Sequence, residues 1–163
     1  MNRTDLTVSA VIEQDGRFLV IEERSSGVLV INHPGGHIEA GESPQQAVIR
    51  EALEETGCEI TAGALLGIYL WIHPRSRRQY LRIVYVCNYI SHDQTRMLDD
   101  GVYAVYWLTP ADLEDRMQNL RTPVVMRCVE DYLAGQRQPD GLLTGLMPIQ
   151  QNVAAVMANA ALV

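Results

Sequence analysis

Short apolar or alternating stretches separated by turn residues predict a chain rich in β-strands. The pattern over Leu6–Glu13 and Phe18–Ile21 is typical of strands, and the Asp15-Gly16 dipeptide between them indicates a hairpin. Further strands are expected at Val28–Ile31, Ala64–Ile72, Tyr80–Ile90 and Tyr103–Leu108. The third strand should end at the Asn32-His33-Pro34-Gly35-Gly36 turn, where two glycines allow the backbone to approach a ligand closely.

The clearest helix signal lies over Pro44–Thr56. Ser43 has the pattern of an N-cap, Gln46 completes a capping box, and Pro44 occupies the first helical position. Gly57 is expected to end the helix in a left-handed conformation. The inward-facing stripe is expected to comprise Ile49, Leu53 and Thr56 with help from Ala52.

Two more helices are expected after the last strand, over Ala111–Met117 and Pro123–Leu133. The length of 163 residues and the absence of a linker predict a single domain over residues 1–147. Residues 148–163 are expected to form a C-terminal tail, either as a docked helix or as a frayed end.

Composition narrows the class of partner. The net charge of −7 argues against a general nucleic-acid binder, which would be basic. No apolar run approaches the ~18 residues that a bilayer requires, so no membrane partner is expected. The three cysteines are odd in number and form no Cys-x-x-Cys motif. They are typical of free thiols in a reducing compartment, which predicts a cytoplasmic protein.

Three carboxylates share one face of the strongest predicted helix. Glu51, Glu54 and Glu55 stand at positions i, i+3 and i+4, with Cβ atoms about 5–6 Å apart. Left unpaired, such a cluster should have raised pKa values, and a hard divalent cation such as Mg²⁺ or Mn²⁺ would neutralise it. The alternative interpretation of these three residues alone is a solvated acidic helix face.

The flanking residues favour the metal site. The pattern Gly36-x5-Glu42-x7-Arg50-Glu51-Ala52-x-Glu54-Glu55-x-Gly57-Cys58 resembles the Nudix box, the signature of the Nudix hydrolases, at every fixed position. The resemblance implies a Nudix-type α/β/α sandwich around a mixed β-sheet. It also implies an enzyme that cleaves a phosphoanhydride with Mg²⁺ or Mn²⁺, an expectation that the acidic helix face supports independently.

The resemblance also implies roles within the box. Glu51, Glu54 and Glu55 would be metal ligands together with the backbone carbonyl of Gly35. Either Glu51 or Glu54 could act as the catalytic base, and the residues alone do not choose between them. Glu42 and Arg50 would form a pair that holds the loop against the helix and orients Glu51. The alternative is a surface ion pair worth under ~1 kcal/mol.

A further carboxylate ligand is expected from another loop. Many Nudix hydrolases supply one just before the strand that here ends near Trp107, but residues 101–106 contain no acid. Asp99 and Asp100 lie immediately upstream, and Asp100 is the expected substitute.

Substrate contacts are expected from basic and aromatic residues outside the box. Arg75, Arg77, Arg78 and Arg82 could bind phosphate or could form a solvated hairpin tip, with Arg82 favoured because it lies within a strand. His33 and His37 flank the glycines and could hydrogen-bond phosphate, or could be ordinary loop histidines. Trp71 and Tyr69 could stack on a base, although aromatic strand residues more often lie in a core.

A looser resemblance extends to small Nudix phosphatases that release orthophosphate. It rests on residues 32–37, Trp71-Ile72, Leu81-Arg82, residues 119–123 and residues 135–137. These enzymes act on nucleoside di- and triphosphates and on the pyrimidine diphosphate precursor of thiamine. The chain is therefore expected to act on a small phosphorylated substrate, as a monomer or a homodimer. The alternatives are another Nudix specificity (a dinucleotide, a nucleotide sugar or an RNA end) or a nucleotide sensor without activity.

Overall fold

The computed structural model describes residues 4–144, and the predicted tail at residues 148–163 lies outside them. In chain order the elements are β1 (Thr4–Gln14), β2 (Arg17–Ser25), β3 (Val28–Asn32), α1 (Pro44–Thr56), β4 (Cys58–Ile72), β5 (Gln79–His92), β6 (Val102–Leu108), α2 (Pro110–Asp115), a short 3₁₀ turn (Met117–Asn119) and α3 (Val124–Leu133). No helix within the described range is long and apolar enough to cross a membrane.

The six strands form one mixed sheet that opens into two parts. In the first part β5 lies between β1, to which it is parallel, and β4, to which it is antiparallel. In the second part β2 lies between β3 and β6. The two parts join where β1 and β2 pair next to their turn, at Glu13–Phe18 and Gln14–Arg17. The predicted mixed sheet is confirmed, and its two parts leave room between them for a site.

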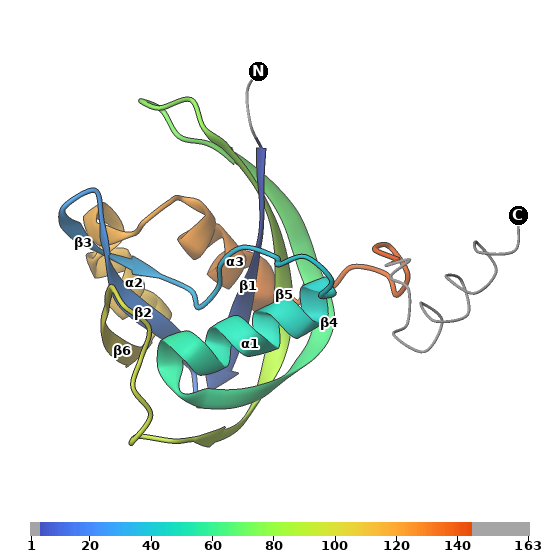
Figure 1. Cartoon of the computed structure of the whole chain (residues 1–163), viewed down its shortest axis with the longest axis horizontal. Helices are drawn as coiled ribbons and strands as arrows, with labels where there is room; N and C mark the ends of the chain where they lie inside the picture. Colours follow the sequence, from blue (N-terminus) through green and yellow to red (C-terminus); the bar gives the residue numbers. More distant parts are fainter. Residues whose placement is uncertain (1–3, 145–163) are drawn as a thin grey trace, which may run out of the picture.

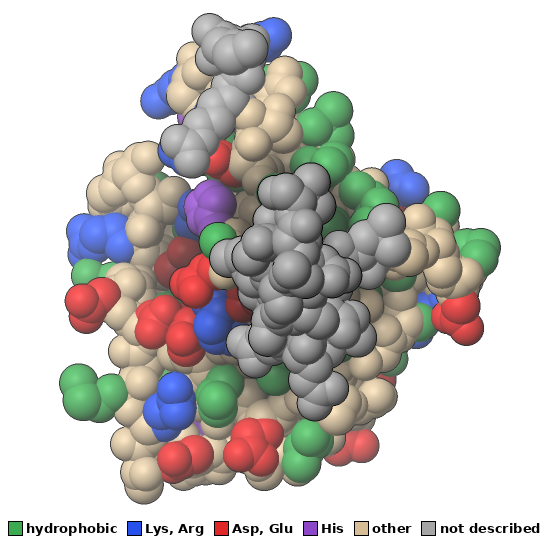
Figure 2. All heavy atoms as spheres, turned by 45° about the vertical axis from the view of Figure 1, so that its right-hand side comes forward, with side chains coloured by type: hydrophobic (Ala, Val, Ile, Leu, Met, Phe, Trp, Pro, Cys, Tyr) green, Lys and Arg blue, Asp and Glu red, His purple; other side chains and the backbone are tan. Residues whose placement is uncertain are grey.

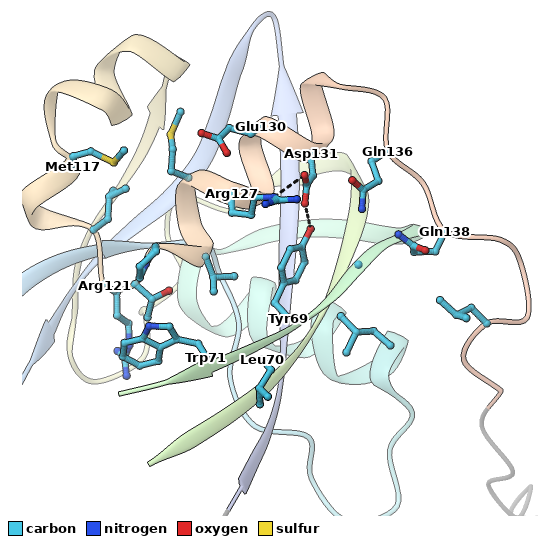
Figure 3. Close-up of a pocket in the computed structure, with 18 residues that line it drawn as sticks. Tyr69, Leu70, Trp71, Met117, Arg121, Arg127, Glu130, Asp131, Gln136 and Gln138 are labelled. Atoms are coloured by element: carbon cyan, nitrogen blue, oxygen red, sulfur yellow. Dashed lines mark hydrogen bonds and ion pairs between the residues drawn. The ribbon is translucent and has the colours of Figure 1, made fainter. Parts of the chain in front are cut away.

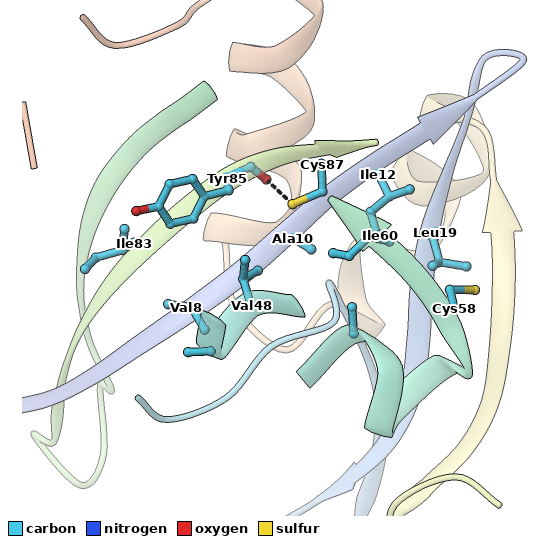
Figure 4. Close-up of a cluster of buried hydrophobic side chains, with 12 residues drawn as sticks. Val8, Ala10, Ile12, Leu19, Val48, Cys58, Ile60, Ile83, Tyr85 and Cys87 are labelled. Carbon is cyan, nitrogen blue, oxygen red and sulfur yellow. Dashed lines mark hydrogen bonds between the residues drawn. The ribbon is translucent and has the colours of Figure 1, made fainter. Parts of the chain in front are cut away.

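Helices cover both faces of the sheet, as Figure 1 shows. Beneath α1, Val48 and Ala52 pack against Val8, Ile60 and Tyr85 in one buried cluster (Figure 4). A second cluster joins the opposite face to α2 and α3; its members include Val11, Phe18, Leu66, Leu113 and Val129. Alternation along each strand sends successive side chains to opposite faces, so both clusters draw on the same strands. The predicted α/β/α sandwich is confirmed.

The structure corrects the predicted inward face of α1. Ala52 and Thr56 are buried as expected, together with Ala47 and Val48, whereas Leu53 is only half-buried and Ile49 is 37% exposed. The helix is therefore rotated relative to the predicted stripe. This rotation turns Glu51 and Glu55 toward the Gly35–Gly36 turn, so the position of the carboxylates and the burial of Val48 are linked.

Candidate active site

Helix α1 begins and ends where the capping signals predicted. Ser43 Oγ accepts a hydrogen bond from the Gln46 N–H (3.2 Å), and Gln46 Oε1 accepts one from the Ser43 N–H (2.8 Å). At the other end Gly57 has a φ of 70° and donates its N–H to the Leu53 carbonyl. These two caps fix the length of the helix and, with it, the position of the carboxylates along its axis.

The turn at Gly35–Gly36, called the glycine turn here, follows β3 in the sequence and lies in space between β1 and α1. The N–H groups of Val8 and Ala10 donate to the carbonyls of Gly36 and Pro34, each at 2.9 Å. On the helix side, the Gly35 N–H donates to Glu55 Oε2 at 2.7 Å. The strand therefore binds the carbonyls on either side of Gly35, while Gly35 itself meets the carboxylate helix.

Side chains would not fit at either glycine. A Cβ on Gly35 would lie 2.1 Å from the backbone oxygen of Val8, and one on Gly36 would lie 2.5 Å from Glu51 Oε1. The obstacle differs between the two positions. A Cβ on Gly35 would meet backbone atoms, whereas a Cβ on Gly36 would meet the end of a side chain. This close approach explains why the turn has two glycines.

Arg50 organises the acidic residues around it. It donates to both carboxylate oxygens of Glu42 (Nε–Oε2 3.1 Å, Nη2–Oε1 2.7 Å), to Glu51 Oε1 (2.9 Å) and to Glu54 Oε2 (3.0 Å). A fifth bond reaches the carbonyl of His37 at 3.1 Å. The hydrogen bond from Arg50 lowers the pKa of Glu42. Arg50 therefore ties the loop before the helix to two of its three carboxylates, in the arrangement expected of an orienting pair.

Burial disfavours the charged form of two carboxylates. It raises the pKa of Glu55 to about 8, since the opposing hydrogen bond from the Gly35 N–H is outweighed and the nearby Glu51, Glu23 and Asp99 add repulsion. Burial also raises the pKa of Glu51 despite the hydrogen bond from Arg50. The predicted rise in pKa is confirmed for these two residues, although burial rather than mutual repulsion is its main cause.

The loop before β6 contributes Asp99 to this region. The Asp99 N–H donates to the Glu54 carbonyl at 3.1 Å, and the charge of Asp99 acts on both Glu51 and Glu55. Asp100, expected as the extra ligand, is the next residue in this loop, and its role stays a prediction. The chain turns here, where the Val102 N–H donates to the Asp99 carbonyl.

The donor chemistry of the site fits a hard divalent cation. Carboxylate oxygens and a glycine carbonyl are the ligand types that Mg²⁺ and Mn²⁺ prefer. A cation would also relieve the cost of keeping Glu51 and Glu55 charged while buried. Across residues 4–144 no three His, Cys, Asp or Glu side chains are already arranged around a common metal position. Arg50 and the Gly35 N–H occupy oxygens of these glutamates instead.

A cleft of about 450 Å³ adjoins the glycine turn. Gly35, Gly36 and His37 form one wall, and Trp71, Arg78 and Arg82 line the opposite side. Figure 2 shows acidic side chains gathered in a hollow of one face, with basic and histidine side chains at its border. The structure therefore brings the start of the box, at Gly36, together with four of the residues expected to contact substrate: His37, Trp71, Arg78 and Arg82.

Four residues at the cleft form a network that sequence analysis missed in part. Arg82 donates from Nη1 to Oδ1 of Asn32 (3.2 Å), and Asn32 donates from Nδ2 to Glu23 (2.9 Å). Glu23 also forms an ion pair with Arg121 at 2.8 Å. Burial lowers the pKa of Arg82, and its hydrogen-bond partner Asn32 is neutral. The nearby carboxylates of Glu23 and Glu55 oppose this shift, and the guanidinium keeps its positive charge beside the cleft.

Two expected substrate contacts lie elsewhere. His33 is only 1% exposed, and its Nε2 donates to the carbonyl of Val125 at 3.1 Å. Burial lowers the pKa of His33 to about 4, so the ring is neutral. Arg75 is exposed at the tip of the β4–β5 hairpin and does not line the cleft. The expectation of substrate contact is wrong for His33, because burial removes it from the cleft, and does not fit the position of Arg75.

Comparison with known proteins identifies the family. The family model of the NUDIX domain matches residues 3–128 of this chain. The chain belongs to the Nudix hydrolases. As a member of this family it is an enzyme that acts on phosphoanhydrides of small phosphorylated substrates, and Nudix hydrolases generally use divalent metal ions.

Individual relatives agree with this assignment. Phosphatase NudJ of Escherichia coli strain K12 and that of Shigella boydii are each 31% identical to this Nudix hydrolase over 139 residues, covering 85% of this chain and 90% of theirs. A NUDIX hydrolase from Nitrosomonas europaea has 39% identity and a TM-score of 0.85, covering 90% of this chain and all of its own. A MutT NUDIX hydrolase from Burkholderia pseudomallei has 26% identity and a TM-score of 0.69, covering 80% and 98%.

Proposed function

We propose that this Nudix hydrolase is a Mg²⁺- or Mn²⁺-dependent phosphatase that releases orthophosphate from small organic di- and triphosphates. Its substrates include nucleoside di- and triphosphates and the pyrimidine diphosphate precursor of thiamine. The observation that carries the proposal is the junction of the Gly35–Gly36 turn, the carboxylates of α1 and a cleft with Arg82 in its far wall. The likeness to relatives named Phosphatase NudJ supports the choice of orthophosphate as product.

The metal ligands in this proposal come from the turn and the helix. Glu51, Glu54 and Glu55 would hold the ion with the carbonyl of Gly35, and Asp99 or Asp100 would add a carboxylate from the loop before β6. When bound there, a divalent ion would neutralise phosphate charge and lower the pKa of a coordinated water.

The chain's own side chains supply the base and its orientation. Glu51 or Glu54 takes the proton from the attacking water, and Arg50 holds both carboxylates through hydrogen bonds of 2.9 and 3.0 Å. Glu42 fixes Arg50 in turn, through the two hydrogen bonds described above. Arg50 and Glu42 are therefore positioning residues.

The phosphate chain lies across the cleft toward Arg82, Arg78 and His37. Two buried hydroxyls at this cleft, Thr7 Oγ1 and Thr122 Oγ1, have no hydrogen-bond partner among the described residues. Phosphate oxygens would satisfy such groups, which otherwise cost free energy to bury. With several donors beyond the metal site, the extra phosphates of the substrate stay bound and only the terminal one is removed.

The three cysteines are free and buried in the structure. This agrees with the proposed cytoplasmic location, where thiols remain reduced.

The products of GTP and CTP hydrolysis test this function. We expect the enzyme with Mg²⁺ to release orthophosphate and a nucleoside diphosphate, measured by ion chromatography at early times. EDTA should abolish release, and added Mg²⁺ or Mn²⁺ should restore it. Pyrophosphate as the primary product would reject the phosphatase proposal and leave the family unchanged, whereas full turnover without metal would reject the proposed mechanism.

A matched pair of variants separates the site from general charge effects. Glu51→Gln removes a proposed ligand, whereas Glu59→Gln makes the same change at an exposed position on β4 whose side chain accepts from Ser91. We expect a loss of kcat of ~100-fold or more for Glu51→Gln, equivalent to ~3 kcal/mol of barrier, and no loss for Glu59→Gln.

A further inference from the structure

Arg82 lines the cleft from β5 without a carboxylate partner. Its Nη1 donates to Oδ1 of Asn32 at 3.2 Å, and the side chain of Asn32 is a neutral amide. Across residues 4–144 Arg82 makes no other hydrogen bond and no ion pair, so most of its N–H donors have no protein partner. Glu23 and Glu55 lie nearby, but each accepts hydrogen bonds from other groups.

The other arginines of the cleft are paired with carboxylates. Arg78 forms an ion pair with Asp5 on β1, and Arg121 forms one with Glu23 on β2 at 2.8 Å. Both arginines line the cleft together with Arg82. Because a carboxylate partner offsets the charge of an arginine, Arg82 has the least compensated positive charge of the three.

A separate groove of about 1150 Å³ between β4 and α3 has the same pairing (Figure 3). In its wall Arg127 donates to Asp131 at 2.8 Å. At one end of the groove Gln138 donates to β4, the edge strand of its sheet, at the carbonyls of Leu65 and Leu66 (2.8 and 3.2 Å). The arginine in this wall is therefore also paired with a carboxylate, in contrast to Arg82.

The amide of Asn32 has one orientation that satisfies both of its neighbours. Its Nδ2 donates to Glu23 at 2.9 Å, and a carboxylate can only accept. Its Oδ1 therefore faces Arg82, which can only donate. Asn32 is 3% exposed and is the last residue of β3, so burial restricts the amide as well. Asn32 thus holds Arg82 in place without adding a negative charge beside it.

We propose that Asn32 is a positioning residue for phosphate binding: it orients the Arg82 guanidinium toward the cleft and leaves its charge for an anionic oxygen of the substrate. This inference rests on the part of the proposed function that places the phosphate chain beside Arg82, and not on which phosphate is released. An aspartate at this position would hold the same guanidinium but would offset its charge. The amide therefore separates the orientation of Arg82 from the neutralisation of its charge.

A double substitution moves one negative charge from residue 23 to residue 32. In Glu23→Gln/Asn32→Asp the side chains can keep their hydrogen bond with donor and acceptor exchanged, and the net charge equals that of the wild type. Glu23→Gln alone is the reference, because Arg121 loses its carboxylate in both proteins. We expect the double variant to bind inorganic tripolyphosphate ~10-fold more weakly than Glu23→Gln, as measured by isothermal titration calorimetry in EDTA.

Kinetics distinguish positioning from a general effect on the fold. From Glu23→Gln to the double variant, KM for GTP with Mg²⁺ should rise by ~10-fold while kcat changes less than ~2-fold. Asn88→Asp makes the same chemical change at an exposed position of β5, where the amide donates to Thr61, and should bind tripolyphosphate as the wild type does. A lower kcat with unchanged KM, or equal affinity for tripolyphosphate in the double variant and Glu23→Gln, would overturn the inference.

The binding measurement is independent of hydrolysis and so separates this inference from the proposed function. Pyrophosphate as the primary product from GTP, together with weaker tripolyphosphate binding in the double variant, overturns the proposed function alone. Orthophosphate as the product, together with equal tripolyphosphate binding, overturns the role of Asn32 alone.

Discussion

Gly35 and Gly36 are adjacent, but the atoms that exclude a side chain differ between them. At Gly35 the obstacle is the Val8 backbone oxygen inside the sheet, and at Gly36 it is the carboxylate of Glu51. Backbone in a paired strand cannot shift without loss of hydrogen bonds, whereas a carboxylate can rotate. The first glycine is therefore required by the fold and the second by the position of the Glu51 carboxylate.

Alanine at each position should separate these two requirements. We expect Gly36→Ala to fold normally but to lose kcat by ~10-fold or more, because Glu51 is displaced. Gly35→Ala should lower the thermal unfolding midpoint, measured by circular dichroism, more than Gly36→Ala does. A Gly36→Ala variant with full activity would show that the position of Glu51 is not critical.

Glu55 combines burial with a charge that the proposed metal needs. Because the pKa of Glu55 is about 8 in the folded protein against an ordinary value of 4.5, the folded state favours its protonated form. Metal-free protein should therefore gain stability as the pH falls from above 8 toward 4.5. Glu55→Gln should lower kcat by ~100-fold or more and should raise the unfolding midpoint of the metal-free protein above pH 8.

The control for Glu55 is the same protein with metal. In saturating Mg²⁺ the wild type should regain stability and Glu55→Gln should not. A variant with near wild-type kcat in saturating Mg²⁺ would remove Glu55 from the proposed ligands.

At the scale of the element, α1 shows what local sequence can predict. Its bounds and both caps follow from Ser43, Pro44, Gln46 and Gly57, since capping depends on residues within one turn. The rotation of α1 about its axis cannot be predicted from these residues. It depends on the Gly35–Gly36 turn, which is distant in sequence and which Glu51 and Glu55 face. Hydrophobic spacing alone therefore predicted that Ile49 is buried, whereas the structure buries its neighbour Val48 and exposes Ile49.

The cap can be tested separately from the chemistry. Ser43→Ala removes the acceptor for the Gln46 N–H and should cost ~1 kcal/mol of unfolding free energy. Because Arg50 and Glu42 still hold the helix to its loop, kcat at saturating substrate should change less than twofold. Denaturant titration and steady-state kinetics measure the two effects; a large loss of kcat would show that the cap also positions the carboxylates.

At the scale of the whole molecule, the cleft is assembled from segments that no local pattern connects. Glu23, Asn32, Arg82 and Arg121 lie on β2, at the end of β3, on β5 and before α3. The motif identified the carboxylate side of the site because its spacing is fixed within one helix. The wall of the cleft that contains Arg82 is formed only when the two parts of the sheet take their final positions. Sequence therefore predicted Arg82 from its place in a strand but not the partners that hold it.

Acid stability of the whole fold should depend on His33. Its pKa of about 4 lies below the ordinary value of 6.5, so the unfolded chain binds the proton more readily. Its contribution to stability is therefore complete above pH 6.5 and is lost as the pH falls toward 4. We expect the drop in unfolding free energy from pH 7 to pH 5 to be up to ~2 kcal/mol smaller in His33→Gln than in wild type.

The matched control for His33 is an exposed histidine. His92→Gln at the end of β5 should leave the pH dependence of wild type unchanged. Because the opposing contribution of Glu55 is present in all three proteins, it cancels from the comparison. Identical slopes in His33→Gln and wild type would contradict the linkage.

The bonds from Gln138 to β4 bear on how the protein behaves at high concentration. An exposed edge strand can recruit a strand from another molecule and so begin aggregation. By occupying the carbonyls of Leu65 and Leu66, Gln138 interrupts that edge just before Ile68 and Leu70, which are exposed. One glutamine after α3 thus shortens the free edge of the sheet, and a strand from another molecule finds less backbone to pair with.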